Sequence, residues 1–581
     1  MTDTNQVSHE QLGLLSSTAD GSSKKPQGSA RSPRVGPEAP LTDAVRKSST
    51  PSAKIRSSML WAAYGDALGF ISELVDHKGL DRRTGGVPLD QLMAWKRRVG
   101  GRWGLDVLLP AGCWSDDTQL RMAVSRSIGS HGFDIESFAR VELPVWPSYA
   151  LGGGRASKAA AKNLGKPSTL WYANTYTGWT NAGGNGAAMR IQPHVWAATD
   201  LNDGYMLDVI TDSVCTHGHP RAIVGACFHA STLAHCLRVG TVPETATCLD
   251  IASRIKGAIC PIEDHRALGT IWIGLWEQAS GKQFRNEWQL AADELSSAVS
   301  RVGIRSETEE DLNVVYKGLV ERLGLTAEHQ RGSGILTTVA ATALAAAAPS
   351  AQDAVVVAAN ALGTDTDTIA TMAGALLGAC DGTDPPPQDP LDSAYLSNEA
   401  DRLSALSQGQ KVAQHAYPDV LTWTSPKTQA DALVSDGDHL VIEGLGRVSE
   451  LDACDAHTAN NDFAWQWVKT QFGQTLLIKR RQALKSLEAN NDLTPPPAPV
   501  STSRSGSTRS RSTSGSRTKA RSGSRNESPQ RSANVEDSLS HTRRNLSDDT
   551  VLGKALRQIA RNGSLSDLLS FTKEIRDDLR R

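Results

Sequence analysis

The sequence predicts a large all-α domain, followed by a small β-rich extension and flanked by disordered tails. Between residues 54 and 406 the chain is rich in Ala and Gly, and its apolar residues recur at the spacing of amphipathic helices. No run of alternating strands interrupts this part of the sequence, so we expect helices packed on helices. With 581 residues, the chain is long enough for one large domain and smaller modules.

The first helix of the domain is predicted by an apolar stripe that begins at Met59 and Leu60 and continues to Leu68. The same periodicity predicts six more helical segments, at 207–239, 245–257, 287–302, 335–348, 352–362 and 368–380. The proline-rich run 384–390 then marks a surface turn at the edge of the domain.

A change of pattern after residue 406 predicts a linker over 407–436 and a small β-rich module over 437–490. Gly473 stands at a turn position in this module. Short apolar runs predict its strands at His439–Ile442, Trp465–Val468 and Thr475–Ile478.

The tails have the composition of disordered segments. Residues 1–53 are rich in Ser, Thr, Pro, Gly and Lys, and 491–547 form a Ser/Arg-rich linker. Within it, residues 501–525 hold ten Ser, six Arg and one Lys with no acid, so they cannot bury enough apolar surface to fold. A solvated linker is the simplest interpretation, while contact with a protein or with nucleic-acid phosphates is the alternative. Apolar periodicity returns over 548–581 and predicts a helical hairpin.

Composition excludes several classes of protein. The formal net charge of −2 excludes a globally basic nucleic-acid binder. The longest apolar tract, Thr338–Ala348, is too short to cross a membrane, so we expect neither a transmembrane helix nor a membrane partner. The N-terminus lacks the pattern of an export signal. Eight Cys without a Cys-x-x-Cys pair indicate reduced thiols, and hence a cytoplasmic protein.

Two acidic clusters stand at predicted helix starts. The first is Ser115-Asp116-Asp117-Thr118, where Ser115 is a good N-cap and the Asp pair falls in the first turn. The second follows a helix stop at Gly363 and holds Asp365 and Asp367. The structural alternative is that these carboxylates only cap their helices. If the two helix starts meet, their hard oxygen ligands suit Mg²⁺, Mn²⁺ or Ca²⁺ rather than zinc.

Three other motifs carry candidate ligand contacts. Glu73 lies just beyond the first helix, where a loop could present it to a ligand or to solvent. The glycines at 183, 184 and 186 expose backbone N–H groups that suit a phosphate, although a tight turn explains them equally well. His217 lacks the further ligands that zinc needs, so it fits better as a partner of a phosphate or a ribose hydroxyl.

The order of these motifs resembles that of the ADP-ribosylglycohydrolase family. This family includes dinitrogenase reductase-activating glycohydrolase and the ADP-ribosylarginine and ADP-ribosylserine hydrolases. The resemblance covers residues 54–406 and rests on five motifs in the family's order. These are Gly65-Asp-Ala-Leu-Gly69, Ser115-Asp-Asp-Thr118, Gly184-Asn-Gly-Ala-Ala-Met-Arg190, Thr216-His-Gly-His-Pro220 and Thr364-Asp-Thr-Asp-Thr-Ile-Ala370.

The resemblance implies an all-α fold with a two-metal site that holds Mg²⁺, or Mn²⁺ in some members. It implies the metal ligands Ser115, Asp116, Asp117, Asp365, Asp367 and Thr368. It implies a mobile catalytic glutamate at Glu73, and Asp117 and Asp367 are the other candidates for proton transfer. It implies that the substrate contacts Gly183, Gly184, Asn185, Gly186, Met189 and His217.

Two positions depart from the family's pattern. Thr364 stands where the family often has glycine, which adds a side chain at a flexible place. Gly183 stands where some members carry an aromatic residue that stacks on adenine. Trp179 and Tyr176 are the residues nearby that could replace it.

The leading hypothesis is a metal-dependent hydrolase that cleaves the glycosidic bond between ADP-ribose and a modified protein side chain, or another ADP-ribosylated molecule. Such a reaction passes through an oxocarbenium-like state. Cations can orient the ribose hydroxyls and the attacking water, and a carboxylate can take the proton of that water. The alternative is a non-catalytic module that binds ADP-ribose or a related nucleotide, with tails that recruit partners. A third interpretation is a scaffold or nucleic-acid factor that acts through the Ser/Arg-rich segment.

Overall fold

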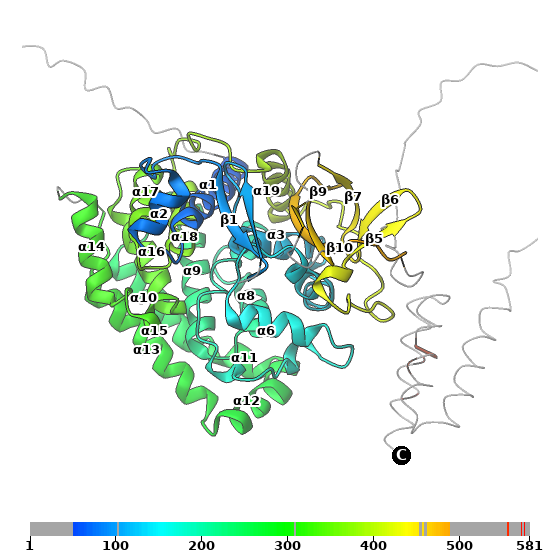
Figure 1. The fold of residues 1–581 in the computed structure, drawn as a ribbon. Helices are drawn as coiled ribbons and strands as arrows, with labels where there is room; N and C mark the ends of the chain where they lie inside the picture. The colour runs from blue at the N-terminus through cyan, green and yellow to red at the C-terminus, as the bar shows by residue number, and fades with distance from the viewer. Residues whose placement is uncertain are drawn as a thin grey trace, which may run out of the picture. The chain divides into compact units, whose positions relative to one another are not determined.

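Helices make up most of the computed structural model, as predicted (Figure 1). The structure describes residues 50–101, 104–306, 310–451, 456–457 and 462–487, together with single residues between 553 and 575. The predicted tail therefore lies outside the described residues up to position 49, and so does the linker 491–547. The hairpin predicted over 548–581 also lies largely outside them, although the five residues described there are helical.

The helices of the domain follow one another in this order: α1 (Pro51–Ser72), α2 (His77–Thr84), α3 (Asp116–Arg126), α4 (Ile135–Ser137), α5 (Leu143–Val145), α6 (Arg155–Leu164), α7 (Gln192–Trp196), α8 (Met206–Thr216), α9 (Pro220–Val239), α10 (Thr245–Gly257), α11 (Ile259–Asp264), α12 (Ile273–Ser280), α13 (Phe284–Val302), α14 (Leu312–Leu323), α15 (Glu328–Arg331), α16 (Gly334–Ala347), α17 (Ala351–Asn360), α18 (Thr366–Gly378) and α19 (Ser393–Ser407). The predicted helical segments coincide with α8 to α10, α13 and α16 to α18. The segment predicted over 207–239 is two helices, because Pro220 begins α9 after a break at His217–His219.

Helix α1 is packed against α18 so closely that their backbones touch. A methyl group added at Gly69 would lie 2.4 Å from the carbonyl oxygen of Thr366, and one added at Gly65 would lie 2.4 Å from that of Ala370. The Thr366 hydroxyl donates to the Gly69 carbonyl at 2.9 Å. The glycines of the first motif therefore serve helix packing, and they bring the start of α18 beside the end of α1 (Figure 1).

A β-hairpin interrupts the helices where the sequence predicted no strands. It pairs β1 (Trp95–Val99) with β2 (Leu105–Leu109) in antiparallel register. The short strands β3 (Ile128–Gly129) and β4 (Gly132–Phe133) form a second small pair. In β1, Trp95 and Val99 are buried while Lys96 is exposed, so the apolar pattern has only two members. Three consecutive basic residues between them hid the strand from sequence analysis.

The β-rich extension is an antiparallel sheet with the strand order β10-β9-β7-β6-β5, and β8 pairs with β9. Gly473, with a φ of 102°, forms the turn between β9 and β10. The strands are β5 (Leu433–Asp436), β6 (His439–Ile442), β7 (Gly446–Glu450), β8 (Ala456–His457), β9 (Phe463–Thr470) and β10 (Thr475–Arg481). The three predicted strands correspond to β6, β9 and β10, while β5 lies in the range predicted to be a linker.

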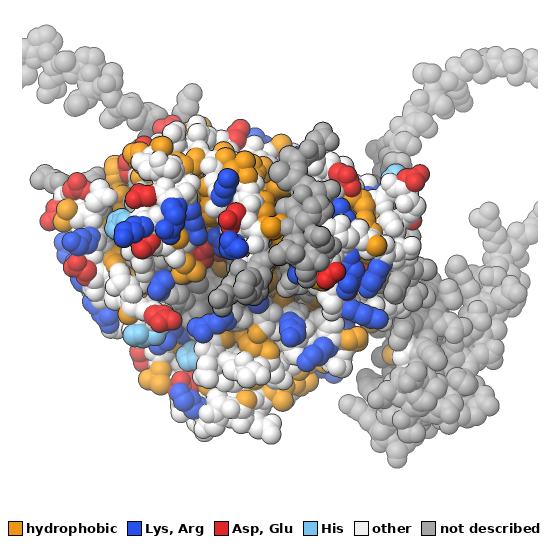
Figure 2. Space-filling model, in the orientation of Figure 1, with side chains coloured by type: hydrophobic (Ala, Val, Ile, Leu, Met, Phe, Trp, Pro, Cys, Tyr) orange, Lys and Arg blue, Asp and Glu red, His pale blue; other side chains and the backbone are white. Residues whose placement is uncertain are grey.

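One helix, α9, has the length and hydropathy to cross a membrane, but 78% of its apolar window is buried inside the structure. It packs against α8, α13 and α16, which is the environment of a core helix. On the face shown in Figure 2, acidic and basic side chains are interspersed, in keeping with the balanced net charge.

Candidate functional site

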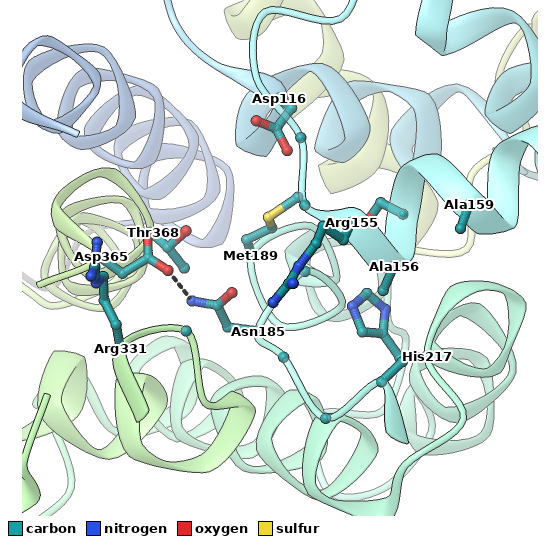
Figure 3. A pocket seen from close by; sticks show the side chains of 18 of the residues that line it. Asp116, Arg155, Ala156, Ala159, Asn185, Met189, His217, Arg331, Asp365 and Thr368 are labelled. Carbon is teal, nitrogen blue, oxygen red and sulfur yellow. Dashed lines mark hydrogen bonds between the residues drawn. The ribbon is translucent and has the colours of Figure 1, made fainter. Parts of the chain in front are cut away.

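A cavity of about 880 Å³ lies where α3, α6, α8 and α18 begin or end. Glu73 and Leu74 from the turn after α1 border it, and the glycine loop 183–186 lines it beside the start of α18, where Asn185 lies next to Asp365 (Figure 3). The cavity gathers most of the predicted site residues, namely Glu73, Asp116, Asp117, Gly183, Gly184, Asn185, Gly186, Met189, His217, Asp365, Asp367 and Thr368. Segments that are hundreds of residues apart in sequence therefore meet at one site.

Ser115 is the one predicted site residue that does not line the cavity. It is fully buried behind the cavity wall, and its hydroxyl oxygen accepts the Asp117 N–H at 3.2 Å. Ser115 is thus the N-cap of α3, as its sequence position predicted.

The start of α3 is capped by a carboxylate from another helix. Buried Asp66 of α1 accepts the Ser115 N–H through one oxygen and the Thr118 N–H through the other, both at 2.9 Å. Ser115 and Asp66 together accept three N–H groups at this helix end, so the Asp116 side chain is not needed as a cap and faces the cavity. The Asp117 side chain is also not fully hydrogen-bonded, because its buried Oδ2 has no hydrogen-bond partner among the described residues.

The start of α18 carries the second cluster. Asp365 occupies the N-cap position without capping the helix through its side chain. Its Oδ2 instead accepts a hydrogen bond of 2.9 Å from Asn185, which ties this cluster to the glycine loop (Figure 3). Asp367 Oδ1 accepts the N–H of Thr368 at 2.9 Å.

The carboxyl groups of the cavity are buried and close to one another, and both conditions raise their pKa values. Burial raises the pKa of Asp116 to about 7, and the charges of Glu73 and Asp66 add to this effect. Burial and the Asp66 carboxylate raise the pKa of Asp117 well above its ordinary value, and burial together with Glu73 does the same for Asp367. The cluster therefore holds more negative charge than its protein surroundings compensate.

Glu73 has a basic partner. Its Oε2 lies 3.6 Å from Nη1 of Arg97, which belongs to β1 and stacks over the Phe70 ring at 4.1 Å. Burial raises the pKa of Glu73, and Arg97 works against that rise. The unpredicted hairpin thus delivers a guanidinium to the predicted catalytic glutamate.

The donor chemistry of the cavity fits a hard divalent cation. Carboxylate and hydroxyl oxygens are the ligands that Mg²⁺ and Mn²⁺ prefer, and the unpartnered Oδ2 of Asp117 offers one of them. No three of the described His, Cys, Asp or Glu side chains are already gathered as a cation site. The carboxylates would have to turn toward a cation to hold it together.

A family model for ADP-ribosylglycohydrolase matches residues 47–416, which is more than half of the chain. The chain belongs to the ADP-ribosylglycohydrolase family. This family acts on ADP-ribosylated substrates and is generally metal-dependent, so the chain belongs to a class of hydrolases. A solved "ADP-ribosylglycohydrolase-related protein complex" is similar with 21% identity and a TM-score of 0.41, over 61% of this chain and 99% of that one. No curated protein matches.

The structure accounts for both departures from the ADP-ribosylglycohydrolase pattern. The left-handed backbone conformation falls on Gly363, with a φ of 89°, so Thr364 adopts no such conformation and donates its hydroxyl to the Ala361 carbonyl. Of the two aromatic candidates for adenine, Tyr176 lines the cavity and Trp179 does not. Trp179 is buried against Gly218 instead, where a methyl group would lie 2.5 Å from its ring.

Two backbone N–H groups of the glycine loop are already hydrogen-bonded to backbone carbonyls of the protein. The N–H of Gly183 donates to Asn181 and that of Asn185 to Gly332, both at 2.9 Å. These two groups do not point freely at a ligand, in contrast to the sequence expectation for the loop. A methyl group at Gly186 would lie 2.9 Å from the His217 ring, so glycine is required there for close approach.

Sequence analysis missed several residues that line or support this cavity. Asp66 stood inside a recognised motif, but its partners on α3 lie about fifty positions away. Arg155 and Arg331 line the cavity and bring positive charge to it (Figure 3). The glycines 152–154 before Arg155 were the available signal for it, whereas no sequence pattern marked Arg97.

Buried Arg121 connects the elements that carry the site. Its guanidinium donates to the Met189 carbonyl at 2.8 Å and to the Thr371 hydroxyl at 2.7 Å, and so joins α3 to the loop before α7 and to α18. Burial lowers the pKa of Arg121 to about 10, so it keeps its charge at neutral pH. The buried guanidinium of Arg121 therefore fixes the positions of these three segments relative to one another.

Proposed function

We propose that this protein hydrolyses the glycosidic bond between ADP-ribose and a modified protein side chain, or another ADP-ribosylated molecule, and releases free ADP-ribose. The observation that supports this most directly is the meeting of α3 and α18. Their first turns bring Asp116, Asp117, Asp365 and Asp367 to one cavity, and the buried Oδ2 of Asp117 is left without a partner. A protein that only needed helix caps would not leave that oxygen unsatisfied.

Divalent cations belong to this proposal. Two Mg²⁺ ions, or Mn²⁺ in their place, would be held by Asp116, Asp117, Asp365, Asp367 and Thr368. The resemblance to the family adds Ser115 as a sixth proposed ligand, although in this structure its hydroxyl caps α3 and does not line the cavity. Cations held there would supply Lewis acidity for ribose hydroxyls and for a water molecule.

The chain's own residues supply the remaining chemistry. Negative charge in a buried cavity stabilises the positive charge that develops on the ribose as the glycosidic bond breaks. Glu73 borders the cavity, and burial raises its pKa, which makes its carboxylate a stronger base toward water. Asp117 and Asp367 are the further candidates for this proton transfer. Tyr176 offers a ring for the adenine.

We place the protein in the cytoplasm. The seven cysteines that the structure describes are all free thiols, which supports a reducing compartment. The Ser/Arg-rich segment, outside the described residues, would add contacts with a protein partner or with nucleic-acid phosphates.

The test is ADP-ribose release from arginine- and serine-ADP-ribosylated proteins, with Mg²⁺ and with a chelator. The Asp117→Asn variant should lose about 10³-fold in rate, because it removes a charge that acts on the developing positive charge and on the cations. Asp353→Asn is the matched control, since Asp353 also lies in a first helical turn but is exposed on α17.

Release that survives both the chelator and Asp117→Asn would contradict the metal-dependent mechanism. If no modified protein is cleaved while ADP-ribose still binds, the protein is instead a binding module for that nucleotide.

A further inference from the structure

A buried chain of hydrogen bonds leads from Asp212 to His217, behind the wall of the cavity. Asp212 Oδ1 accepts from Arg190 Nε at 2.9 Å and from Arg190 Nη2 at 2.7 Å. The same Nη2 donates to the Thr216 hydroxyl at 2.9 Å, and that hydroxyl lies 2.8 Å from Nδ1 of His217. All four side chains are buried.

The direction of each hydrogen bond in this chain can be assigned. A guanidinium only donates, so the Thr216 oxygen accepts from Arg190. The Thr216 oxygen has a second lone pair and could accept from Nδ1 of His217 as well, but its buried hydroxyl proton would then find no acceptor among the contacts of the described residues. We therefore assign the hydroxyl as the donor and Nδ1 as the acceptor. Burial would raise the pKa of Asp212, but Arg190 and His194 outweigh this effect and hold it below its ordinary value. Asp212 is therefore the fixed anion that anchors the chain.

His217 is neutral as well as oriented. Burial, reinforced by the charge of Arg190, lowers its pKa to about 3. A neutral imidazole carries one proton, and since Nδ1 accepts a hydrogen bond, that proton sits on Nε2.

The Nε2 edge of His217 faces the glycine loop at the cavity. A methyl group at Gly186 would lie 3.1 Å from Nε2, and His217 itself lines the cavity (Figure 3). Arg190 Nη1 also donates to the Gly186 carbonyl at 2.9 Å. One guanidinium therefore fixes both the loop and, through Thr216, the imidazole beside it.

We propose that Thr216 is a positioning residue which, with Arg190 and Asp212, holds His217 as the neutral Nε2–H tautomer. His217 then donates one hydrogen bond to an oxygen acceptor of the ligand, either a phosphate oxygen or a ribose hydroxyl oxygen, and does not act as a base. The identity of the ligand rests on the proposed function, whereas the tautomer does not.

Two other histidines, the half-buried His219 and the buried His229, provide internal references. His219 Nδ1 accepts the backbone N–H of Arg221 at 3.1 Å, so His219 also carries its proton on Nε2. His229 is the opposite case, because its Nε2 lies 3.0 Å from the amide nitrogen of Gln192. That amide is fixed as a donor, since Gln192 Oε1 accepts from Arg121 at 3.0 Å, so His229 carries its proton on Nδ1.

The first experiment is ¹⁵N NMR of the imidazoles in the full chain, with ¹⁵N-labelled histidine. Wild type should show His217 as a single Nε2–H tautomer. Thr216→Val removes the hydroxyl at nearly constant volume and should give His217 a mixture of tautomers, while His219 and His229 stay unchanged. Thr216→Ser should restore the wild-type signal, which a purely structural role of Thr216 would not predict.

The second experiment is calorimetric binding of ADP-ribose and of ADP. Thr216→Val should weaken ADP-ribose binding about fivefold to tenfold, and Thr216→Ser should stay within about twofold of wild type. His217→Phe removes the donor and should lose about tenfold, while His217→Gln keeps an N–H near the position of Nε2 and should lose less. Equal losses for ADP and ADP-ribose would assign the hydrogen bond to a phosphate, and a loss for ADP-ribose alone would assign it to the distal ribose.

A wild-type His217 protonated on Nδ1 would overturn the proposal. So would a Thr216→Val variant whose tautomer and affinity both match wild type. If wild type fails to bind ADP-ribose, the proposed function and the ligand assigned to His217 fall together, while the NMR result still decides the role of Thr216.

Discussion

Helix α3 carries buried charged side chains at both of its ends. Only at its C-terminal end are these charges balanced by protein groups of opposite charge. There, Arg126 makes a paired contact with Glu142 at 2.7 and 2.8 Å, and its other nitrogen donates to Tyr395 and Gln474. The Phe472 ring covers the guanidinium at 4.9 Å.

The N-terminal end of the same helix carries Asp116 and Asp117 among other carboxylates. Ser115 and Asp66 accept three backbone N–H groups at this end, those of Ser115, Asp117 and Thr118, and Asp117 Oδ2 has no described partner. The comparison separates two uses of buried charge. A buried charge whose partners are all protein groups stabilises the packing of the fold, and here it joins the β-rich extension to the helices. A buried charge without a protein partner is available to bind a ligand.

The largest effect on stability is expected at the compensated end. Arg126→Met leaves Glu142 buried without its cation, so the free energy of unfolding should fall by about 3–5 kcal/mol, measured by urea denaturation. Arg98→Met is the control, because Arg98 and Asp106 form an exposed pair and its loss should cost less than about 1 kcal/mol. A cost at Arg126 as small as at Arg98 would break the comparison.

The next effect is expected from cations at the uncompensated end. Mg²⁺ at a hundred times its dissociation constant should raise the free energy of unfolding of wild type by about 2.7 kcal/mol, because it binds only the folded state. Asp117→Asn should lose most of this gain, and Asp353→Asn should keep it. Thermal unfolding at a series of Mg²⁺ concentrations measures both, and equal gains in wild type and Asp117→Asn would argue against a site at α3.

A smaller effect tests how the uncompensated end is assembled. In Gly69→Ala the new methyl group would lie 2.5 Å from the Cα of Asp367, so α1 and α18 must separate. We expect a loss of about 1–3 kcal/mol in unfolding free energy and a loss of ADP-ribose release from the remaining folded protein. Gly274→Ala is the control, because a methyl group there meets nothing within 4 Å and should stabilise α12 slightly. Equal activity in both variants would contradict this assembly.

The smallest effect has a defined pH dependence. A carboxyl group whose pKa is raised on folding does not reduce the stability of the fold at a pH below its ordinary pKa near 4. It reduces stability most at a pH above its folded pKa, which is about 7 for Asp116. The uncompensated end therefore loses stability as pH rises through this window. Without metal, Asp117→Asn should be more stable than wild type at pH 7.5 and no more stable at pH 4, because burial also raises the pKa of Asp117. Denaturation curves at both pH values measure the difference, and a gain that is larger at pH 4 would refute it.

Local features of the site could be predicted from the sequence. Ser115 and the Asp pair predict the start of α3, whereas the glycines at 65 and 69 were compatible with either close helix packing or approach to a ligand, and the structure shows the packing. What the sequence could not show is which local features meet, because α1 and α18 are brought together by tertiary packing alone. The resemblance to a family supplied that expectation, and the structure places both acidic clusters on one cavity.

The residues missed by sequence analysis share a cause. Asp66 and Arg97 act on partners outside their own segments, so no local spacing marks them. The strand that carries Arg97 is hidden because basic side chains occupy its middle, and only two apolar residues anchor it. Thr364 departs from the family's glycine at no conformational cost, because Gly363 carries the left-handed turn.

The contact between α1 and α18 also sets the order of events on the ribosome. The hydroxyl of Thr366 meets the carbonyl of Gly69 across 297 positions of sequence, so nearly the whole domain must be synthesised before α1 finds its partner. Until then α1, which is buried on almost every side in the folded domain, lacks the helix that it contacts most. No nascent chain that stops short of α18 can therefore have the complete site.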